Sequence, residues 1–183
     1  MATRITLSDF QADLARKLAD SAHRPVAAGW LGVAWKGVHA LLPLAHAGEI
    51  FNPSALQRLP HTQPWVLGVA SLRGGLAVVV DWASFLGLEP NASWHPTELE
   101  TVYWVSLNPM LGVGAALCAD QLLGLRGPSD FQAEAQSPPH PAVRQMWRDR
   151  SGQVWHELDL VVMAQSPEFL DPRLPAFAVQ ASA

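Results

Sequence analysis

The chain has 183 residues, of which 49% are apolar and 15% are charged, and its formal net charge is −4. This composition supplies a hydrophobic core and excludes a chain that is disordered throughout, and the length fits one domain or two small fused ones. The negative charge, with no block of basic residues, argues against nucleic acid as a main partner, because that binding needs clustered Lys and Arg against phosphate.

Cysteine usage and hydropathy give a first indication of the protein's setting. Cys118 is the single cysteine, so no intrachain disulfide can form, and its apolar neighbours predict a buried side chain. Charged residues interrupt every apolar stretch near the N-terminus. We therefore expect neither a signal peptide nor direct membrane insertion, and predict a cytoplasmic protein.

Residues 1–28 are predicted to form an N-terminal helical extension. A capping-box pattern begins at Ser8, and Phe10, Leu14 and Leu18 recur every four residues as one apolar stripe. A stripe this narrow must pack either on its own domain or on a partner, and the sequence leaves both possibilities open.

From Gly29 onward, short β-type runs alternate with turn residues. Strands are expected at about residues 30–36, 38–44, 65–72, 76–80, 101–107, 111–118, 121–125, 143–148 and 153–158. Connections are expected at residues 52–64, 89–97 and 128–142. About nine short strands with closely spaced turns favour barrels or a sandwich over a parallel sheet covered by helices.

Two strand–aspartate–helix segments form a weak internal echo. Asp81 follows an apolar run and can cap a short helix that ends at Leu86, and Asp159 can cap a second helix that ends near Gln165. Two small β-barrels, each closed by one short helix, would explain both segments. We therefore predict a mainly β fold with two barrel subdomains.

The sequence contains no pattern typical of an active site. The seven histidines form no HExxH motif or other familiar metal-ligand spacing, and no Gly-rich loop ends in Lys-Ser or Lys-Thr. Gly112 and Gly114 lie in an apolar run and indicate a close approach of two backbones. We expect no enzyme activity, no metal and no cofactor, although a small hydrolase that uses Asp81 or His156 is an alternative.

Eight tryptophans offer a further alternative, a stand-alone β-barrel module that binds a carbohydrate or a peptide. Such a module would use Trp65 and Trp94, which lie in or beside loops, for exposed contacts. Five others sit among aliphatic residues and are predicted to be core: Trp30, Trp35, Trp82, Trp104 and Trp155.

One stretch resembles the signature of the CheW family. Residues 65–88 carry an apolar strand that ends in Leu-Arg-Gly, a second strand that ends in Val-Asp, and a short helix that ends in Leu-Gly. Further similarity lies at residues 30–35, 47–50 and 119–124. The resemblance covers about residues 29–165, is most similar to the PilI-type subfamily, and leaves residues 166–183 as a C-terminal tail.

The resemblance implies a fold, a function and partners. The fold would be two SH3-like five-stranded barrels side by side. The function would be that of a non-catalytic scaffold that couples the cytoplasmic tip of methyl-accepting chemoreceptors to a CheA-type histidine kinase, recruited to membrane-associated receptor arrays. The PilI-type pattern favours the system that controls type IV pili and twitching motility, and flagellar chemotaxis is the alternative.

The resemblance also implies a receptor groove between the barrels. Arg73 of the Leu-Arg-Gly turn and Glu49 of the Glu-Ile element are predicted to form an ion pair that fixes the loop beside this groove. The complete set of expected groove residues is Glu49, Ile50, Leu67, Val69, Leu72, Arg73 and Gly74. Alternation along a strand places Leu67 and Val69 on one face and Leu72 on the other, so that only some of them can line the groove.

Overall fold

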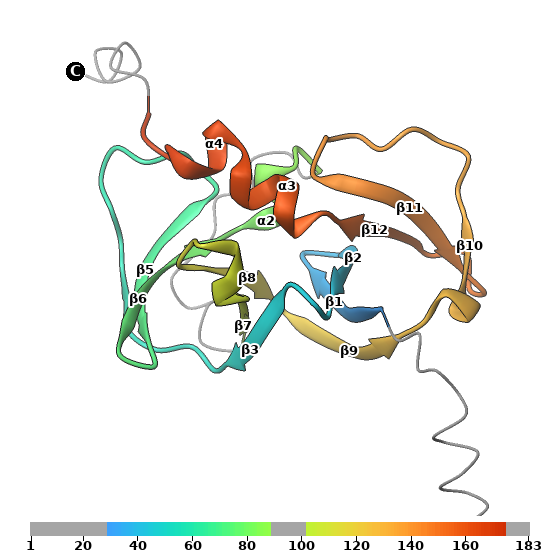
Figure 1. The fold of residues 1–183 in the computed structure, drawn as a ribbon, viewed down its shortest axis with the longest axis horizontal. Coiled ribbons are helices and arrows are strands. Elements are labelled where there is room, and N and C mark those ends of the chain that lie inside the picture. The colour runs from blue at the N-terminus through green and yellow to red at the C-terminus, as the bar shows by residue number, and fades with distance from the viewer. Residues whose placement is uncertain (1–28, 89–101, 175–183) are drawn as a thin grey trace, which may run out of the picture.

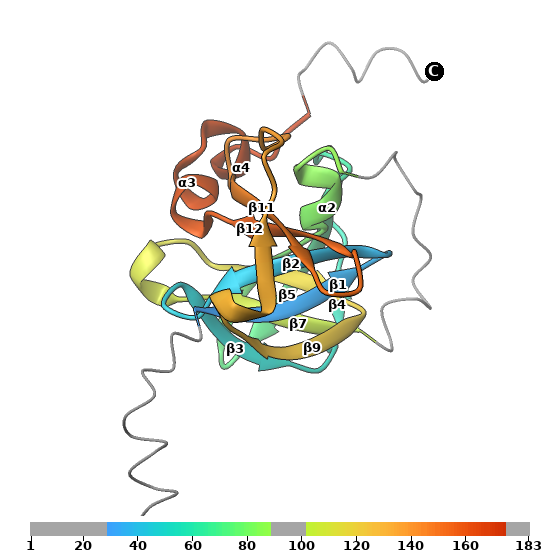
Figure 2. The ribbon, with the colours of Figure 1, turned by 90° about the vertical axis from the view of Figure 1, so that its right-hand side faces the viewer.

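The computed structural model describes residues 29–88 and 102–174, which form two β-sheets with a few short helices. Figure 1 shows the sheets side by side, with the helices gathered along one side of the molecule, and Figure 2 gives the view turned by 90°. The predicted helix within residues 1–28 and the connection at 89–97 lie outside the described residues. Within the described part, no helix has the length and apolarity needed to span a membrane.

The first sheet, sheet A, contains strands from both ends of the described chain. Its strands are β1 (Trp30–Trp35), β2 (Val38–Pro43), β9 (Gln121–Arg126), β10 (Phe131–Ala133), β11 (Val143–Asp149) and β12 (Val154–Leu158). Their order across the sheet is β10-β11-β12-β2-β1-β9. All neighbours are antiparallel except β12 and β2, which run parallel.

The second sheet, sheet B, is built from the continuous middle of the chain. Its strands are β3 (Ala47–Phe51), β4 (Leu56–Gln57), β5 (Val66–Leu72), β6 (Gly75–Val80), β7 (Tyr103–Leu107) and β8 (Ala115–Ala119). Their order is β3-β7-β8-β6-β5-β4, and only β6 and β8 run parallel.

Each sheet curls back on itself. In sheet B the two edge strands, β3 and β4, are joined by residues 52–55, and in sheet A the edge strands β9 and β10 are joined by residues 127–130. Strands that stand at opposite edges of a flat six-stranded sheet would lie about 24 Å apart, farther than four residues can span. The short connections therefore require the strong curl of a small barrel, in agreement with the predicted fold class, although each sheet in the described part has six strands and not the five that the resemblance implied.

The two sheets have the same strand topology in a permuted chain order. When sheet A is read from its β9 edge and sheet B from its β3 edge, each parallel pair occupies the third and fourth places. In sheet B, the β7–β8 hairpin follows the other strands, whereas in sheet A the matching β1–β2 hairpin precedes them. The structure therefore contains two similar halves, as predicted, but all the strands of sheet B lie between β2 and β9 of sheet A along the chain.

A short helix follows the matching strand of each sheet. The predicted aspartate caps are confirmed: Asp81 accepts a hydrogen bond from Ser84 N at the start of α2 (Trp82–Phe85), and Asp159 accepts from Val161 N and Val162 N at the start of α3 (Leu160–Gln165). A further helix, α4 (Pro167–Leu170), lies within the segment predicted as a tail.

Three short strands are absent from the set of strands expected from alternation and turn residues. β4 and β10 lie in segments interpreted as connections, and β3 was identified only through its Glu-Ile pattern. Conversely, the predicted strand at 111–118 begins only at Ala115, because a 3₁₀ turn, η2 (Pro109–Leu111), and Gly112 in the left-handed region (φ 72°) precede it.

A main core joins the two sheets. In β2, Leu42 belongs to the large cluster that includes the sheet B strands, whereas its neighbour Leu41 faces a smaller cluster with Trp30 and Trp155. Cys118 is fully buried, as predicted. The tryptophans predicted to be core are all buried: Trp30, Trp35, Trp82, Trp104 and Trp155.

The prediction for Trp65 is wrong. Its side chain is only 5% exposed and stacks on Phe169 of α4, with ring centroids 5.8 Å apart and ring planes 2° from parallel. Phe85 of α2 meets both rings edge-on. Trp65 therefore anchors the C-terminal helix to sheet B and is not an exposed contact, while Trp94 falls outside the described residues.

Candidate functional site

The turn between β5 and β6 consists of two residues, Arg73 and Gly74. Leu72 pairs with Gly75 across it, and both turn residues have positive φ, 47° for Arg73 and 79° for Gly74. Two positive φ values define the type I′ turn, which matches the twist of a hairpin and favours Asn-Gly. An arginine in this conformation carries a backbone cost of order 1 kcal/mol, so this position indicates a use for the side chain itself.

The predicted ion pair between Arg73 and Glu49 is present. Arg73 Nε lies 2.6 Å from Glu49 Oε2, and the two side chains are 74% and 48% exposed. The backbone N–H of Glu49 donates to Ser106 Oγ at 2.9 Å, which holds β3 against β7. A pair this exposed adds only about 0–1 kcal/mol of stability, so its main effect is to position the β5–β6 turn over β3.

Glu49 and Arg73 stand on the rim of a groove of about 670 Å³, which we name the Glu49–Arg73 groove. Its wall comes from β3, the β5–β6 hairpin and the connection between β7 and β8. The lining residues are Gly48, Glu49, Phe51, Leu72, Arg73, Gly75, Leu76, Ala77, Ser106, Leu107, Asn108, Pro109, Gly112, Val113, Gly114 and Ala115. All of them belong to sheet B or its connections, whereas the family resemblance implied a groove between the two barrels.

Three of the predicted site residues, Glu49, Leu72 and Arg73, line this groove together. Gly74 completes the turn beside it. Ile50 is 45% exposed on β3 but is not part of the lining.

The other two predicted residues, Leu67 and Val69, lie away from the lining. Leu67 is 1% exposed and belongs to the core, and Val69 is half-buried. A register shift between Val66 and Gly68 interrupts the alternation from which the faces of Leu67 and Val69 were predicted.

Sequence reasoning missed the wall of the groove formed between β7 and β8. Asn108 caps η2 through its side chain, which also donates to Ala45 O, while its backbone N–H donates to His46 O. The predicted close approach is confirmed at Gly114, where an added Cβ would lie 2.9 Å from Leu76 O. Leu76 itself is 76% exposed on β6 and presents a large apolar surface at the groove. The sequence signals that could have located this wall are the Asn-Pro turn at Asn108 and the glycine in an apolar run at Gly114.

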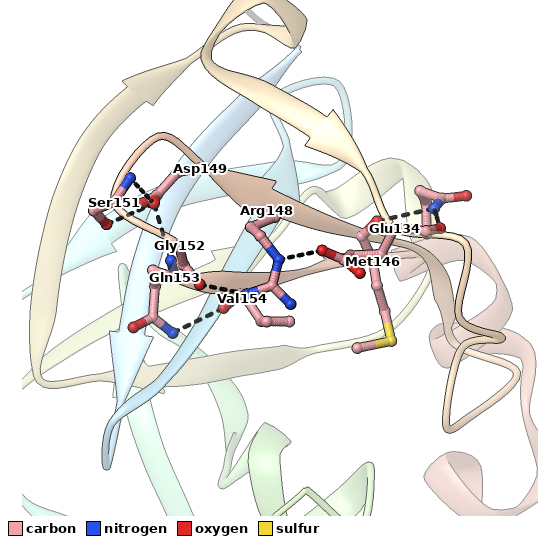
Figure 3. Close-up of polar contacts among 9 residues, drawn as sticks. Glu134, Met146, Arg148, Asp149, Ser151, Gly152, Gln153 and Val154 are labelled. Carbon is pink, nitrogen blue, oxygen red and sulfur yellow. Dashed lines mark hydrogen bonds and ion pairs between the residues drawn. The ribbon is translucent and has the colours of Figure 1, made fainter.

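A second, more polar hollow lies on sheet A, beside the β11–β12 turn. Figure 3 shows the polar contacts of this turn. Asp149 organises this turn by accepting hydrogen bonds from Ser151 N, Ser151 Oγ and Gln153 N. Arg148 donates to Gly152 O at 2.7 Å and pairs with Glu134 next to β10. The hydrogen bond from Ser151, with further bonds from Trp155 and Gln153, lowers the pKa of Asp149 to about 2. The polar side chains around this hollow therefore bind one another and hold the β11–β12 turn in shape.

The residues considered for a hydrolase serve structural roles. Asp81 is 2% exposed and caps α2. His156 lies on β12 with Nδ1 3.2 Å from His39 O, and burial lowers its pKa. Burial likewise raises the pKa of the Cys118 thiol well above its usual value, which opposes formation of a nucleophilic thiolate. Within the described ranges, no group of three or more His, Cys, Asp or Glu side chains is placed to hold a metal ion.

Comparisons with known proteins place this geometry in context. The model of the CheW-like domain matches residues 30–168. Protein PilI of Pseudomonas aeruginosa (strain PAO1) is 30% identical over 148 residues, which cover 78% of this chain and 79% of that protein. The crystal structure of the scaffolding protein TtCheW from Thermoanaerobacter tengcongensis superposes with a TM-score of 0.58 at 13% identity, over 75% of this chain and 92% of that one.

Proposed function

We propose that this chain, which belongs to the CheW-like domain family, is a non-catalytic adaptor that couples methyl-accepting chemoreceptors to a CheA-type histidine kinase. The observation that carries the proposal is the Glu49–Arg73 groove, an apolar hollow whose rim is set by an exposed ion pair. Membership of a scaffold family supports binding as the activity.

The groove suits a helical partner. An amphipathic helix binds by placing apolar side chains into a hydrophobic groove, and Leu72, Leu76 and Val113 supply the apolar surface here. Arg73 and Glu49 add one cation and one anion at the rim, which can contact charged side chains of a bound helix and fix its orientation. The cytoplasmic tip of a chemoreceptor, a helical hairpin, is the occupant we propose.

We infer the pathway from the similarity to Protein PilI. Similarity to Protein PilI over most of both chains supports a role in the chemosensory system of type IV pili and twitching motility. We place the protein in the cytoplasm, recruited through the receptors to membrane-associated arrays. Flagellar chemotaxis is the second candidate, because the CheW-like domain itself does not distinguish the two systems.

A pair of arginine variants tests the receptor site. Arg73→Ala removes the charge at the groove, and Arg150→Ala removes an exposed arginine from the β11–β12 turn of sheet A. The affinity for a receptor cytoplasmic fragment, measured by co-sedimentation, is expected to fall at least about tenfold for Arg73→Ala, because a charged contact is lost. The affinity is expected to stay unchanged for Arg150→Ala. Equal binding by both variants would reject the groove as the receptor site.

A pull-down from a bacterial lysate tests the adaptor role itself. The full chain is expected to retain a histidine kinase and a methyl-accepting receptor together, which neither a hydrolase nor a carbohydrate-binding module would do. The carbohydrate module has lost one of its two proposed contacts, because Trp65 is buried. Recovery of a glycan, with neither the kinase nor the receptor, would favour that alternative.

A further inference from the structure

We propose that the N-terminal segment, through the apolar stripe of Phe10, Leu14 and Leu18, docks into the Glu49–Arg73 groove of its own chain. The docking concerns this chain alone, and its consequence for receptor binding rests on the proposed function.

The described part of the chain begins close to the wall of the groove. The carbonyl of Gly29 accepts a hydrogen bond from Leu44 N at 2.8 Å. The next two residues along the chain, Ala45 and His46, both accept hydrogen bonds from Asn108, which lines the groove. The N-terminal segment therefore enters the fold within a few residues of the groove wall.

The connection between the predicted helix and Gly29 is long enough to reach the groove. The predicted helix ends at about residue 22, which leaves residues 23–28 as a connection to Gly29. Six residues span up to about 20 Å when extended. The path from Gly29 through Leu44 to Asn108 involves two hydrogen bonds and one peptide step, so the connection is long enough to bring the end of the helix to the Asn108 wall, from which the helix can continue along the groove.

The apolar stripe and the groove are complementary in hydrophobicity and charge. The groove leaves Leu76, which is 76% exposed, and the partly exposed Leu72 without full apolar cover. The stripe offers matching apolar side chains at helical spacing. Asp13 and Lys17 flank one side of the stripe a helical turn apart, and the rim presents Arg73 and Glu49 as opposite charges for them.

Such docking would make the segment an intramolecular competitor for the receptor helix. A tethered segment has an effective concentration in the millimolar range, so even a weak intrinsic contact keeps the groove partly occupied. Receptor binding would then have to displace the segment, and the apparent receptor affinity would fall in proportion to the free fraction of the groove.

Cysteine cross-linking in the full chain tests the docking directly. Cys118 is fully buried and can stay in place, so that the introduced cysteines are the accessible thiols. The test variant is Leu14→Cys/Leu76→Cys, and the control is Leu14→Cys/Leu125→Cys. Leu125 is 64% exposed and pairs with Leu31 of β1, so it lies close to the chain entry but on sheet A.

A disulfide forms only when the two Cα atoms come within about 7 Å. Under mild oxidation the test variant is expected to give an intramolecular disulfide at least about tenfold faster than the control, because docking raises the local thiol concentration at Leu76. Equal rates, or a covalent dimer in place of the intramolecular product, would overturn the proposal.

Receptor binding separates this inference from the proposed function. Leu14→Ser/Leu18→Ser is expected to raise the affinity for a receptor cytoplasmic fragment about threefold or more by freeing the groove. The control Ala12→Ser/Ala19→Ser, at positions on the side of the predicted helix away from the stripe, is expected to leave the affinity unchanged. Selective cross-linking without receptor binding would retain the docking and reject the proposed function. If neither variant changes the receptor affinity, and the two cysteine pairs form disulfides at equal rates, the docking is rejected while the proposed function stands.

Discussion

Lys36 and Asp81 form a buried ion pair that ties sheet A to sheet B. Lys36 Nζ lies 3.1 Å from Asp81 Oδ2, and the side chains are only 17% and 3% exposed. Lys36 belongs to the β1–β2 turn, whereas Asp81 follows β6 and caps α2. The backbone N–H of Lys36 also donates to Asp120 Oδ2 at 2.7 Å, between β8 and β9. Lys36 therefore links its own turn to two other segments at the junction of the sheets.

The Lys36–Asp81 pair is expected to contribute strongly to stability. Lys36→Met keeps the length of the side chain and removes its charge, which leaves the Asp81 carboxylate buried without its cation. Breaking a buried pair in this way costs about 3–5 kcal/mol. Urea denaturation at pH 7 measures the loss. The double variant Lys36→Met/Asp81→Asn is expected to recover part of it, because Asn still caps α2 without a buried charge. A loss below about 1 kcal/mol for the single variant would contradict a structural role.

The β5–β6 turn allows stability and binding to be separated. Arg73→Asn replaces a side chain that disfavours positive φ with one that tolerates it, a gain of about 0.5–1 kcal/mol that offsets the exposed ion pair. We therefore expect the melting temperature to stay the same or rise while receptor affinity falls. Thermal denaturation and co-sedimentation on the same preparation measure the two effects. A variant that is both less stable and fully able to bind would contradict the role given to Arg73.

Asp149 is expected to make the free energy of unfolding fall as the pH is lowered through the acid range. Its pKa is lowered to about 2, first by the Ser151 hydroxyl and then by Trp155 and Gln153. A lowered folded-state pKa means that the stabilisation is complete above the ordinary value near 3.8 and is lost as the pH falls toward 2. The carboxylate lies close to solvent, so we expect about 1 kcal/mol.

Asp149→Asn is the variant that measures this contribution. It is expected to be less stable than the natural chain in urea at pH 7 and equally stable near pH 2. Arg150→Ala, in the same turn, serves as the control with an unchanged acid limb. A difference between Asp149→Asn and the natural chain that persists undiminished at pH 2 would assign the effect to packing instead of charge.

Gly114 and Gly75 both line the groove but differ in the space around them. A Cβ on Gly114 would lie 2.9 Å from Leu76 O, a backbone atom, whereas a Cβ on Gly75 would meet Leu72 O at an ordinary 3.6 Å. Gly114→Ala is expected to destabilise the chain by about 1–3 kcal/mol, as overpacking does, and to weaken receptor binding. Gly75→Ala is expected to retain the stability of the natural chain. Urea midpoints compare them, and equal midpoints would contradict the close approach of β6 and β8.

The local sequence determined more of the fold than of the groove. Turn residues and apolar alternation located the longer strands, because those signals act within a few residues, and Asp81 and Asp159 were recognised as caps for the same reason. The permuted strand order depends on the pairing of β12 with β2, and a contact so distant in sequence leaves no local pattern. Trp65 was misplaced because its burial comes from Phe169, about a hundred residues further along the chain.

The groove shows the same division. Glu49 and Arg73 were found through the family pattern, whereas the positive φ of Arg73 was not predicted, because it depends on the pairing of Leu72 with Gly75 across a two-residue turn. The contribution of Asn108 was not predicted, because it depends on the hydrogen bonds of this residue to Ala45 and His46 across the sheet. Leu67 was assigned to the candidate surface because a bulge in β5 cannot be read from alternation.

The interleaved strand order has a consequence for synthesis on the ribosome. Sheet B comes from one continuous segment and is complete once β8 has emerged, whereas β2 must wait for β12, and the contact between His39 and His156 joins residues 117 apart in sequence. At about 5–20 residues per second, the β1–β2 hairpin exposes an unpaired edge for several seconds. Nascent chains are therefore most vulnerable to aggregation and to chaperone capture during this interval. The interval ends when β12, the last strand to be translated, pairs with β2.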